Sequence, residues 1–319
     1  MSAIPLGDFR RVRVAAVRQV ACDVRTFDLI AADGRPLAAF TAGAHLHVQV
    51  PAGLLRQYSL CGDPRDASRY VIAVKREAPG RGGSASMHEA VETGSVLAIA
   101  GPRNNFPLSA DASHSVLIAG GIGVTPLYAM AQTLQQAGRP WRMHYCARAA
   151  AHAAFYEELR ALRSDAVTPY FSAAPILDAA ALLRENKPGT HVYCCGPAGL
   201  MQAVMDATAH WPDEHVHFEW FSGSADAGAP GMAFEVELAR SGIVLAVPEN
   251  RSILEVVRAR GVEIPSSCEE GVCGTCETPV LAGTVEHRDH LLSAAERQAN
   301  RSMMICVSRA RGGRLVLDL

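Results

Sequence analysis

The chain has 319 residues and a net charge of −2, with 49% hydrophobic and 19% charged residues. This composition is ordinary for a soluble globular protein, and the length allows two or three domains with buried cores. The balanced charge provides no positive field for nucleic acid, and no stretch approaches the roughly 18 apolar residues of a membrane span. The N-terminus lacks the apolar stretch of a secretory signal, so we expect a cytoplasmic protein that is not bound to a membrane.

Residues 1–108 predict a small antiparallel β-barrel. Strand-like runs at Arg11–Val17, His45–Val50 and Tyr70–Val74 are separated by turn signals such as Asp33 followed by Gly34. Short, closely spaced strands with glycine, proline and aspartate turns between them are typical of such barrels.

Residues 109–221 have a different pattern, in which strand-like and helix-like stretches alternate. The strand-like stretches are Val116–Ala119, Arg142–Cys146, His191–Cys195 and Val216–Trp220. The helix-like stretches are Pro126–Gln136, His152–Leu162 and Ala198–Ala209. This alternation predicts an α/β domain with a parallel, doubly wound sheet.

Residues 222–231 are small and rich in glycine, serine and alanine, a composition typical of a linker. Residues 232–319 then predict a third, compact domain. Phe234–Leu238 and Val244–Val247 indicate a strand pair, and Ile253–Arg260 indicates a helix that ends at Gly261.

Four of the nine cysteines form the strongest signal in the chain: Cys268, Cys273, Cys276 and Cys306. Their C-x4-C-x2-C…C spacing is that of plant-type [2Fe–2S] ligation, in which one loop supplies three thiolates and a distant cysteine supplies the fourth. We expect backbone N–H groups near the loop glycines to point at the sulfurs. A structural zinc site is the alternative, but it usually pairs two C-x2-C motifs or adds histidines.

Two glycine turns follow predicted strands in the middle domain. Gly120, Gly121 and Gly123 lead into a helix through Thr125 and Pro126, and Cys195, Gly196 and Pro197 open a later helix in the same way. Ligands of open α/β sheets bind at the carboxyl ends of the strands, and helix N-termini favour phosphate. The first turn is not the G-x-G-x-x-G fingerprint, so a purely structural turn is the alternative for each.

The barrel segment carries two further candidate motifs. Arg56, Gln57, Tyr58 and Ser59 form one, and the glycine-rich segment Gly80–Ser84 forms the other. Taken alone, the first could be an ordinary strand and the second a flexible turn. In isolation the ordinary strand is the better explanation of the first motif, although an arginine fork and glycine amides have the chemistry to bind a phosphate group.

The C-terminal domain resembles plant-type ferredoxins, with a β-grasp fold, and the two preceding domains resemble the ferredoxin–NADP reductase superfamily. The order of the three domains resembles the phthalate dioxygenase reductase family over nearly the whole chain. The resemblance implies FMN binding by residues of the barrel domain: Arg56, Gln57, Tyr58, Ser59, Ala73, Val74, Lys75, Gly82, Gly83 and Ser84. It implies pyridine nucleotide binding by Gly121, Gly123, Thr125, Arg148, Cys195, Gly196 and Pro197.

The same resemblance implies which residues lie at the reacting rings. Phe221 would cover the flavin, and Ser59, Cys195 and Glu219 are the candidate catalytic residues beside the flavin and the nicotinamide. The choice of NADH over NADPH also follows from the family: a 2′-phosphate is the alternative partner of Arg148, but we expect this arginine to contact the pyrophosphate or ribose. FMN over FAD depends on Gly82, Gly83 and Ser84.

Electron counting then predicts the order of transfer. NADH releases two electrons together, whereas an iron–sulfur cluster accepts one, so the flavin must stand between them. The family resemblance implies that the cluster passes electrons to a Rieske-type oxygenase component acting on an aromatic or related substrate. A flavin-dependent NAD(P)H reductase with another electron acceptor is the alternative.

Overall fold

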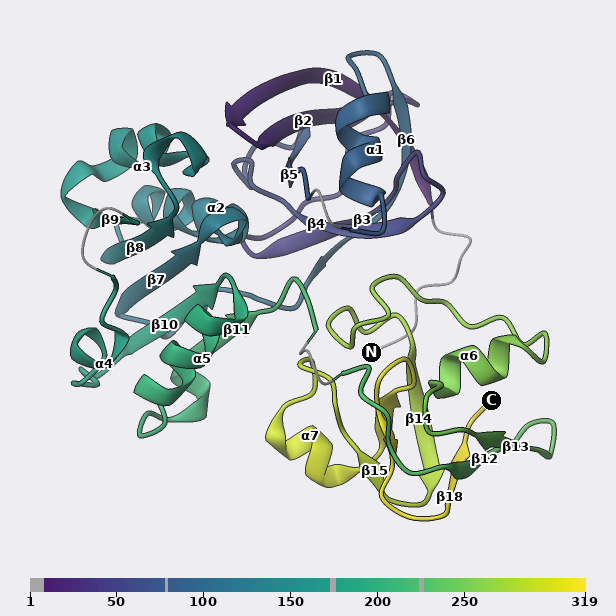
Figure 1. The fold of residues 1–319 in the computed structure, drawn as a ribbon. Coiled ribbons are helices and arrows are strands. Elements are labelled where there is room, and N and C mark those ends of the chain that lie inside the picture. Colours follow the sequence, from purple (N-terminus) through teal and green to yellow (C-terminus); the bar gives the residue numbers. More distant parts are fainter. Residues whose placement is uncertain (1–8, 78–79, 173–175, 224–226) are drawn as a thin grey trace. The chain divides into compact units, whose positions relative to one another are not determined.

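The computed structural model describes residues 9–77, 80–172, 176–223 and 227–319, and these form two compact units, Phe9–Phe221 and Ser222–Leu319 (Figure 1). Residues 224–226 of the predicted linker and residues 1–8, on which the expectation of no secretory signal depends, lie outside the described residues. Within the described ranges, no helix combines the length and the hydropathy needed to cross a membrane.

The first part of the larger unit is the predicted antiparallel barrel. Its strands are β1 (Arg10–Ala21), β2 (Val24–Ala31), β3 (Ala44–Gln49), β4 (Leu55–Ser59), β5 (Tyr70–Lys75) and β6 (Val96–Asn104). They pair antiparallel in the order β4-β3-β6-β1-β2-β5, and the two edge strands meet again through a bridge between Leu60 and Ile72. The sheet therefore curls on itself around Phe27, Leu46 and Ile72, and α1 (Gly83–Ala90) follows β5.

The second part is the predicted parallel α/β domain. Its strands are β7 (His114–Gly120), β8 (Trp141–Ala147), β9 (Val167–Phe171), β10 (Thr190–Cys195) and β11 (Val216–Glu219), in the order β11-β10-β7-β8-β9. Its helices are α2 (Val124–Gln136), α3 (Tyr156–Arg163), α4 (Ala179–Leu182) and α5 (Ala198–Ala207). All neighbouring strands are parallel, which confirms the predicted sheet.

The α/β domain differs from the sequence prediction in several details, among them the unpredicted short helix α4 and the end of α5 at Ala207 instead of Ala209. Strand β9 was missed because its sequence contains Pro169, which is tolerated there because β9 is an edge strand. The helix expected from His152 begins at Tyr156, because Phe155 adopts a left-handed backbone conformation with φ of 61°. The last strand ends at Glu219, one residue earlier than expected.

The parallel sheet is covered on both faces. Leu117, Met143 and Tyr193 pack against α2 and α3 on one face, in a core that continues into the barrel through Cys61 and Phe106. On the other face, Val192 and Cys194 pack against α4 and α5. Because the barrel and the α/β domain share one apolar core, they form a single unit.

The smaller unit has a mixed sheet with a helix packed on it, as expected for a β-grasp fold. Strands β12 (Phe234–Leu238), β13 (Ile243–Val247), β14 (Glu277–Ala282), β16 (Ser302–Met304) and β18 (Arg314–Leu317) follow the order β13-β12-β18-β14-β16. A small ladder joins β15 (Val285–Glu286) to β17 (Arg309–Ala310), and α7 (Ala294–Ala299) lies between β15 and β16 in the chain.

The predicted strand pair and helix of this unit are present. Strands β12 and β13 are antiparallel neighbours, and α6 (Ile253–Arg258) is two residues shorter than predicted. A capping box between Ser252 and Glu255 satisfies the first amides of α6, and its apolar face enters the core. This helix lies directly before the loop that carries the first three clustered cysteines.

Candidate active site and metal centre

Three strands of the larger unit end at one place. Ser59 ends β4 of the barrel, while Cys195 and Glu219 end the neighbouring strands β10 and β11 and face each other in the sheet register. The Ser59 hydroxyl donates a hydrogen bond to Glu219 Oε2 at 3.4 Å. The three candidate catalytic residues therefore converge, although Ser59 and Glu219 are 160 positions apart in the chain.

Burial controls the protonation of this site. It raises the pKa of Glu219 to about 8, against the opposing effect of the Ser59 hydrogen bond, and it raises the pKa of the Cys195 thiol well above its ordinary value. Both groups therefore carry their proton at neutral pH. Glu219 can hold or release a proton next to the Ser59 hydroxyl. The side chain of Cys195 is a small, uncharged thiol and not a thiolate.

The two predicted glycine turns lie against each other. A β-carbon on Gly123 would lie 2.2 Å from the Cys195 carbonyl oxygen, and one on Gly196 would lie 2.9 Å from the α-carbon of Gly120. Only glycine permits this approach of the two strand ends. The hydroxyl of Thr125 donates to the Ile122 carbonyl at 3.0 Å, which closes the first turn of α2.

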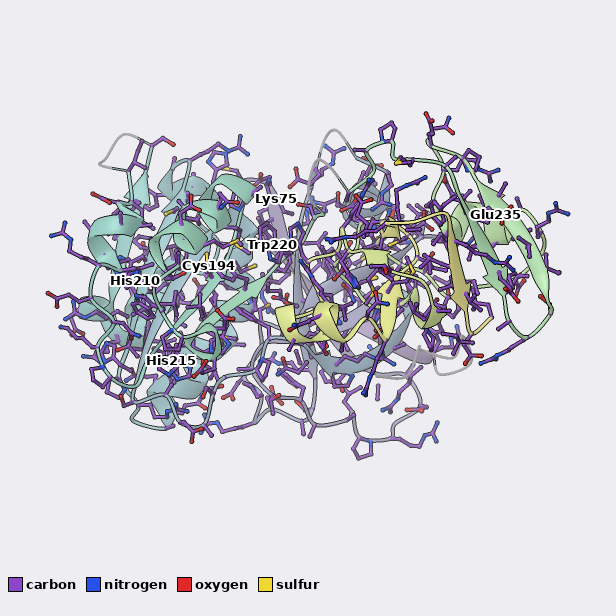
Figure 2. The ribbon with its side chains drawn as sticks, turned by 90° about the horizontal axis from the view of Figure 1, so that it is seen from below. Lys75, Cys194, His210, His215, Trp220 and Glu235 are labelled. Carbon is purple, nitrogen blue, oxygen red and sulfur yellow. The ribbon has the colours of Figure 1, made fainter. Side chains whose placement is uncertain are left out.

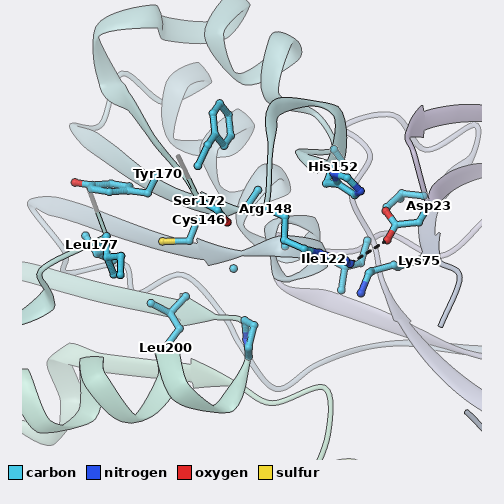
Figure 3. Close-up of a pocket in the computed structure, with 18 residues that line it drawn as sticks. Asp23, Lys75, Ile122, Cys146, Arg148, His152, Tyr170, Ser172, Leu177 and Leu200 are labelled. Carbon is cyan, nitrogen blue, oxygen red and sulfur yellow. Dashed lines mark ion pairs between the residues drawn. The ribbon is translucent and has the colours of Figure 1, made fainter. Parts of the chain in front are cut away.

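A cavity of about 420 Å³ opens at the carboxyl ends of β7, β8 and β9 (Figure 3). Gly121, Arg148, Pro197 and Lys75 line it, so it gathers residues predicted for the pyridine nucleotide together with one predicted for the flavin. Among the described residues, its lining does not include Ser59, Cys195 or Glu219. A dinucleotide bound here must extend past Pro197 to reach them.

The two ends of the cavity differ in chemistry. Lys75, Arg148 and Asp23 give a charged end, where Arg148 and Asp23 form an ion pair of 3.8 Å (Figure 3). Leu177 and Leu200 give an apolar end. This polarity suits a ligand that has a phosphate group at one place and an apolar ring at another.

Several lining residues were missed by sequence reasoning. Four of them lie at or just after the carboxyl ends of β8 and β9: Cys146, Tyr170, Phe171 and Ser172. Asp23 lies in the β1–β2 turn of the barrel. The rule that ligands bind at strand carboxyl ends could have found those on β8. Tyr170 could have been found only if β9 had been predicted as a strand. Its hydroxyl lies 3.0 Å from His144 Nδ1.

The phosphate candidates of the barrel are also neighbours. A β-carbon on Gly83 would lie 2.9 Å from Nε of Arg56, so the guanidinium lies beside the first turn of α1. Gly82 precedes this helix with φ of +83°, and no side chain caps it. The first turn of a helix without a side-chain cap, next to an arginine, fits a phosphate monoester. The Ser84 hydroxyl accepts a hydrogen bond from the Glu77 amide at 3.1 Å.

The remaining flavin candidates lie on β4 and β5. The Gln57 amide contacts His45 and His47 at 3.0 and 2.9 Å, whereas the half-buried Tyr58 packs against the barrel core. On β5, Ala73 is buried in the core shared by the barrel and the α/β domain, and Val74 is buried in the barrel core, so only their backbone could meet a cofactor.

Lys75 and Phe221 are two further flavin candidates, and solvent reaches both. Lys75 forms an ion pair of 2.6 Å with Glu77 beside the cavity, and Phe221 is 43% exposed after the end of β11. In contrast, Cys194 on β10 and Trp220, both labelled in Figure 2, pack in the core that contains Met201 and Val204 of α5. The thiol of Cys194 donates to the Met201 sulfur at 3.6 Å, as expected for an inert core cysteine.

The four clustered cysteines approach one another in two pairs in the smaller unit. Cys268 hydrogen-bonds with Cys273, and Cys276 with Cys306. The pKa of Cys273 is lowered to about 6, chiefly by the Cys268 hydrogen bond, while the pKa values of Cys268 and Cys306 are raised. Cys268 and Cys306 are thus disfavoured as thiolates in the absence of a metal, and a cationic centre would stabilise the thiolate form of all four cysteines.

The loop geometry also fits a two-iron cluster. Gly271 and Gly274 have φ of +74° and +75°, and the Glu270 amide donates to Cys268 Sγ at 3.3 Å, as the sequence predicted for N–H groups near the sulfurs. Within the described chain, no group of three or more His, Cys, Asp or Glu side chains could hold a single metal ion. Two pairs of sulfurs suit two irons with two thiolates each, whereas zinc would require its ligands around one point.

Comparison with known proteins agrees with this arrangement. Residues 236–311 match the 2Fe-2S iron-sulfur cluster binding domain, and residues 102–215 match the N-terminal domain of dimethylamine monooxygenase subunit DmmA-like proteins. The reductase subunit of a tert-butanol monooxygenase / tert-amyl alcohol desaturase from Aquincola tertiaricarbonis is 46% identical, over 97% of this chain and 95% of its own length.

Solved structures that are similar over nearly the whole chain include a phthalate dioxygenase reductase and a cytochrome P450 monooxygenase. Phthalate dioxygenase reductase, described as a modular structure for electron transfer from pyridine nucleotides to [2Fe-2S], is 42% identical with a TM-score of 0.74, over 98% of both chains. An intact type IV self-sufficient cytochrome P450 monooxygenase is 39% identical with a TM-score of 0.88; it covers all of this chain, which spans 43% of that protein.

Identity of this level over nearly the full length of both chains confirms the resemblance seen in the sequence. The chain belongs to the phthalate dioxygenase reductase family, and its C-terminal residues form the 2Fe-2S iron-sulfur cluster binding domain of that family.

Proposed function

We propose that this chain oxidises NADH and delivers the electrons singly to a separate Rieske-type oxygenase component. The observation that carries the proposal is the convergence of Ser59 from the barrel with Cys195 and Glu219 from the parallel sheet. In an α/β sheet, this edge is where a nucleotide binds, and the barrel closes it from the other side. The relatives named above are reductases of oxygenase systems, which supports the same assignment.

NADH would bind across the two glycine turns and along the cavity. The backbone of the two turns would bind the pyrophosphate at close range. The residues concerned are Gly121, Gly123 and Thr125 at the start of α2, together with Gly196 and Pro197. Arg148 would add charge from the end of β8. Cys195 would leave room for the nicotinamide because its thiol is small and uncharged.

FMN supplies the chemistry that the chain lacks, since it takes up two electrons and releases them one at a time. Arg56 with Gly82, Gly83 and Ser84 would hold its phosphate. The flavin ring system would lie beside β4 and β5, and Phe221 would cover it. The bordering residues would be Gln57, Tyr58 and Ser59 on β4, and Ala73, Val74 and Lys75 on β5. Glu219, protonated at neutral pH and bonded to Ser59, would hold a proton at this border.

Cys268, Cys273, Cys276 and Cys306 would ligate the [2Fe–2S] cluster that sends electrons onward. The domain assignment belongs to the same proposal: residues 1–108 bind FMN, residues 109–221 bind NADH, residues 222–231 are the linker and residues 232–319 bind the cluster. We further propose a cytoplasmic location, where NADH is supplied.

An anaerobic absorption spectrum tests the proposal directly. We expect flavin bands together with iron–sulfur absorbance, and rapid bleaching of both when NADH is added. A flavin spectrum without cluster absorbance in protein that contains no iron would contradict the cluster assignment. Bleaching by NADPH but not by NADH would contradict the assigned nucleotide.

A second candidate acceptor is a cytochrome P450. The observation that favours it is the similarity to the self-sufficient cytochrome P450 monooxygenase, in which a chain of this fold forms part of a longer protein. Reduction of a purified P450 at a rate that matches or exceeds reduction of a Rieske oxygenase would support this acceptor.

A further inference from the structure

The reaction site of the larger unit is divided between two domains. Ser59 belongs to the barrel, whereas Cys195 and Glu219 belong to the parallel sheet. The bond between Ser59 and Glu219 is 3.4 Å long, beyond the roughly 2.5–3.0 Å usual for a hydroxyl donor, so a small shift between the domains would break it. Contacts between the two domains must therefore fix their relative position.

Helix α2 contacts both halves of the site. At its start, Gly123 lies against the Cys195 carbonyl, where even a β-carbon would come within 2.2 Å. Nine residues later, Nε2 of Gln132 donates a hydrogen bond of 3.1 Å to the carbonyl oxygen of Cys61, two residues after Ser59. One rigid helix of about 1.5 Å rise per residue thus joins the end of β10 to the end of β4.

The Cys61 end of this link is firmly attached to the barrel. The Cys61 amide donates to the Val71 carbonyl at 2.9 Å, and Leu60 forms the bridge to Ile72. Cys61 is buried in the core that α2 shares with the barrel. A hydrogen bond to its carbonyl therefore acts on the backbone that carries Ser59, and not on a loose loop.

Gln136 offers a natural comparison one turn further along α2. Its Nε2 donates at 3.0 Å to the Asp63 side chain, in the same barrel segment. However, Gln136 is exposed, and Asp63 is also paired with Arg65 at 2.9 Å. The two glutamines make similar bonds across the same boundary, but only that of Gln132 reaches backbone next to the reaction site.

We propose that Gln132 is a positioning residue that holds Ser59 at its working distance from Glu219 and Cys195. This inference depends on the proposed function for its kinetic consequence. The amide of Gln132 touches neither substrate nor cofactor in the assignment above. It acts through the Cys61 backbone, by fixing the barrel strand end relative to α2.

The test compares the Gln132→Met and Gln136→Met variants of the full-length protein with FMN and the cluster bound. Methionine keeps the length of the side chain and removes the donor. For Gln132→Met we expect the limiting rate of flavin reduction by NADH to fall about ten-fold, because sub-ångström misplacement of reacting groups is costly. The dissociation constants of NADH and FMN should stay within about two-fold of wild type, as expected for loss of positioning alone.

A second readout needs no turnover. The Ser59 hydrogen bond lowers the pKa of Glu219, so loosening it should raise that pKa in the Gln132→Met protein. Infrared titration of the protonated carboxyl stretch of Glu219 should detect this shift, which should be absent in Gln136→Met. Gln132→Asn, whose amide is one methylene shorter, should behave like Gln132→Met and replaces it if the methionine variant does not fold.

Equal reduction rates and equal Glu219 titrations in the Gln132 and Gln136 variants would overturn the inference. Failure of NADH to reduce the flavin of the wild-type protein would instead overturn the proposed function, and the infrared comparison would still test Gln132.

Discussion

The cluster loop and the flavin-side reaction site are both mostly buried, but they are built over very different lengths of chain. Three of the four clustered cysteines lie between positions 268 and 276, and an amide of the same loop points at a sulfur. The reaction site instead brings together Ser59 and Glu219 from two domains. The first site depends on local loop conformation, whereas the second depends on how two domains pack, which makes it sensitive to distant residues such as Gln132.

The largest expected effect would separate the two sites. In a Cys276→Ser variant, one thiolate of the Cys276–Cys306 pair is lost, and we expect iron content to fall from about two atoms per chain to nearly none. Electron delivery to an external acceptor through the cluster should fall at least about 100-fold with it. Flavin reduction by NADH, followed by anaerobic stopped-flow absorbance, should change less than two-fold because the larger unit has its own core. A parallel loss of flavin reduction would contradict this independence.

A second prediction concerns the contact of the glycine turns. Gly123→Ala would place a β-carbon 2.2 Å from the Cys195 carbonyl oxygen, whereas Gly199→Ala, at the start of α5, would meet no atom within 4 Å. We expect the first substitution to lower the free energy of unfolding by about 3 kcal/mol, as overpacking against backbone does. The second should change it by less than about 0.5 kcal/mol.

Thermal or urea unfolding measures this pair of variants. Equal stability of the two would show that the strand ends are free to separate, and would remove the packing argument for a shared reaction site.

The third prediction concerns the proton on Glu219. Its pKa is about 8 in the folded protein and 4.5 ordinarily, so the folded state binds this proton more tightly than the unfolded state does. The resulting stability is fully present below pH 4.5 and is lost as pH rises to about 8. Relative to Glu219→Gln, which cannot ionise, the wild-type protein should lose about 2 kcal/mol between pH 6 and pH 8.

Urea unfolding of both proteins across this pH range provides the measurement. Parallel pH profiles for the two proteins would mean that Glu219 is ionised in the folded state, and would remove its assigned role as a proton holder.

The smallest expected effect concerns the cavity. Arg148 lines its charged end, but its side chain is 71% exposed, so each contact with NADH contributes little. We expect Arg148→Ala to raise the KM for NADH about five-fold with little change in kcat, because it removes binding shared by ground and transition states. Arg142→Ala, an exposed position near the amino end of the same strand, is the matched control and should leave both constants unchanged. A rise in KM for both variants would indicate a general charge effect.

The sequence alone was sufficient to predict the folds of the three domains, their order along the chain, and a plant-type [2Fe–2S] domain from the cysteine spacing. The reason is that each depends on short-range pattern: alternation of strands and helices, glycine turns, and a ligand loop of nine residues. The family resemblance extended these patterns to FMN, NADH and the oxygenase partner. The individual roles of Arg56, Ser59, Cys195 and Glu219 stay predictions that the variants above can test.

The folded arrangement was needed for everything that depends on long-range packing. Asp23 comes from a barrel turn and Tyr170 from an edge strand interrupted by proline, and neither carries a local signal for the cavity that they line. The same holds for Gln132, which looks in sequence like any polar residue of an amphipathic helix. Its hydrogen bond to the Cys61 carbonyl exists only because two domains share one core, and a periodic pattern contains no information about which residues meet across such a boundary.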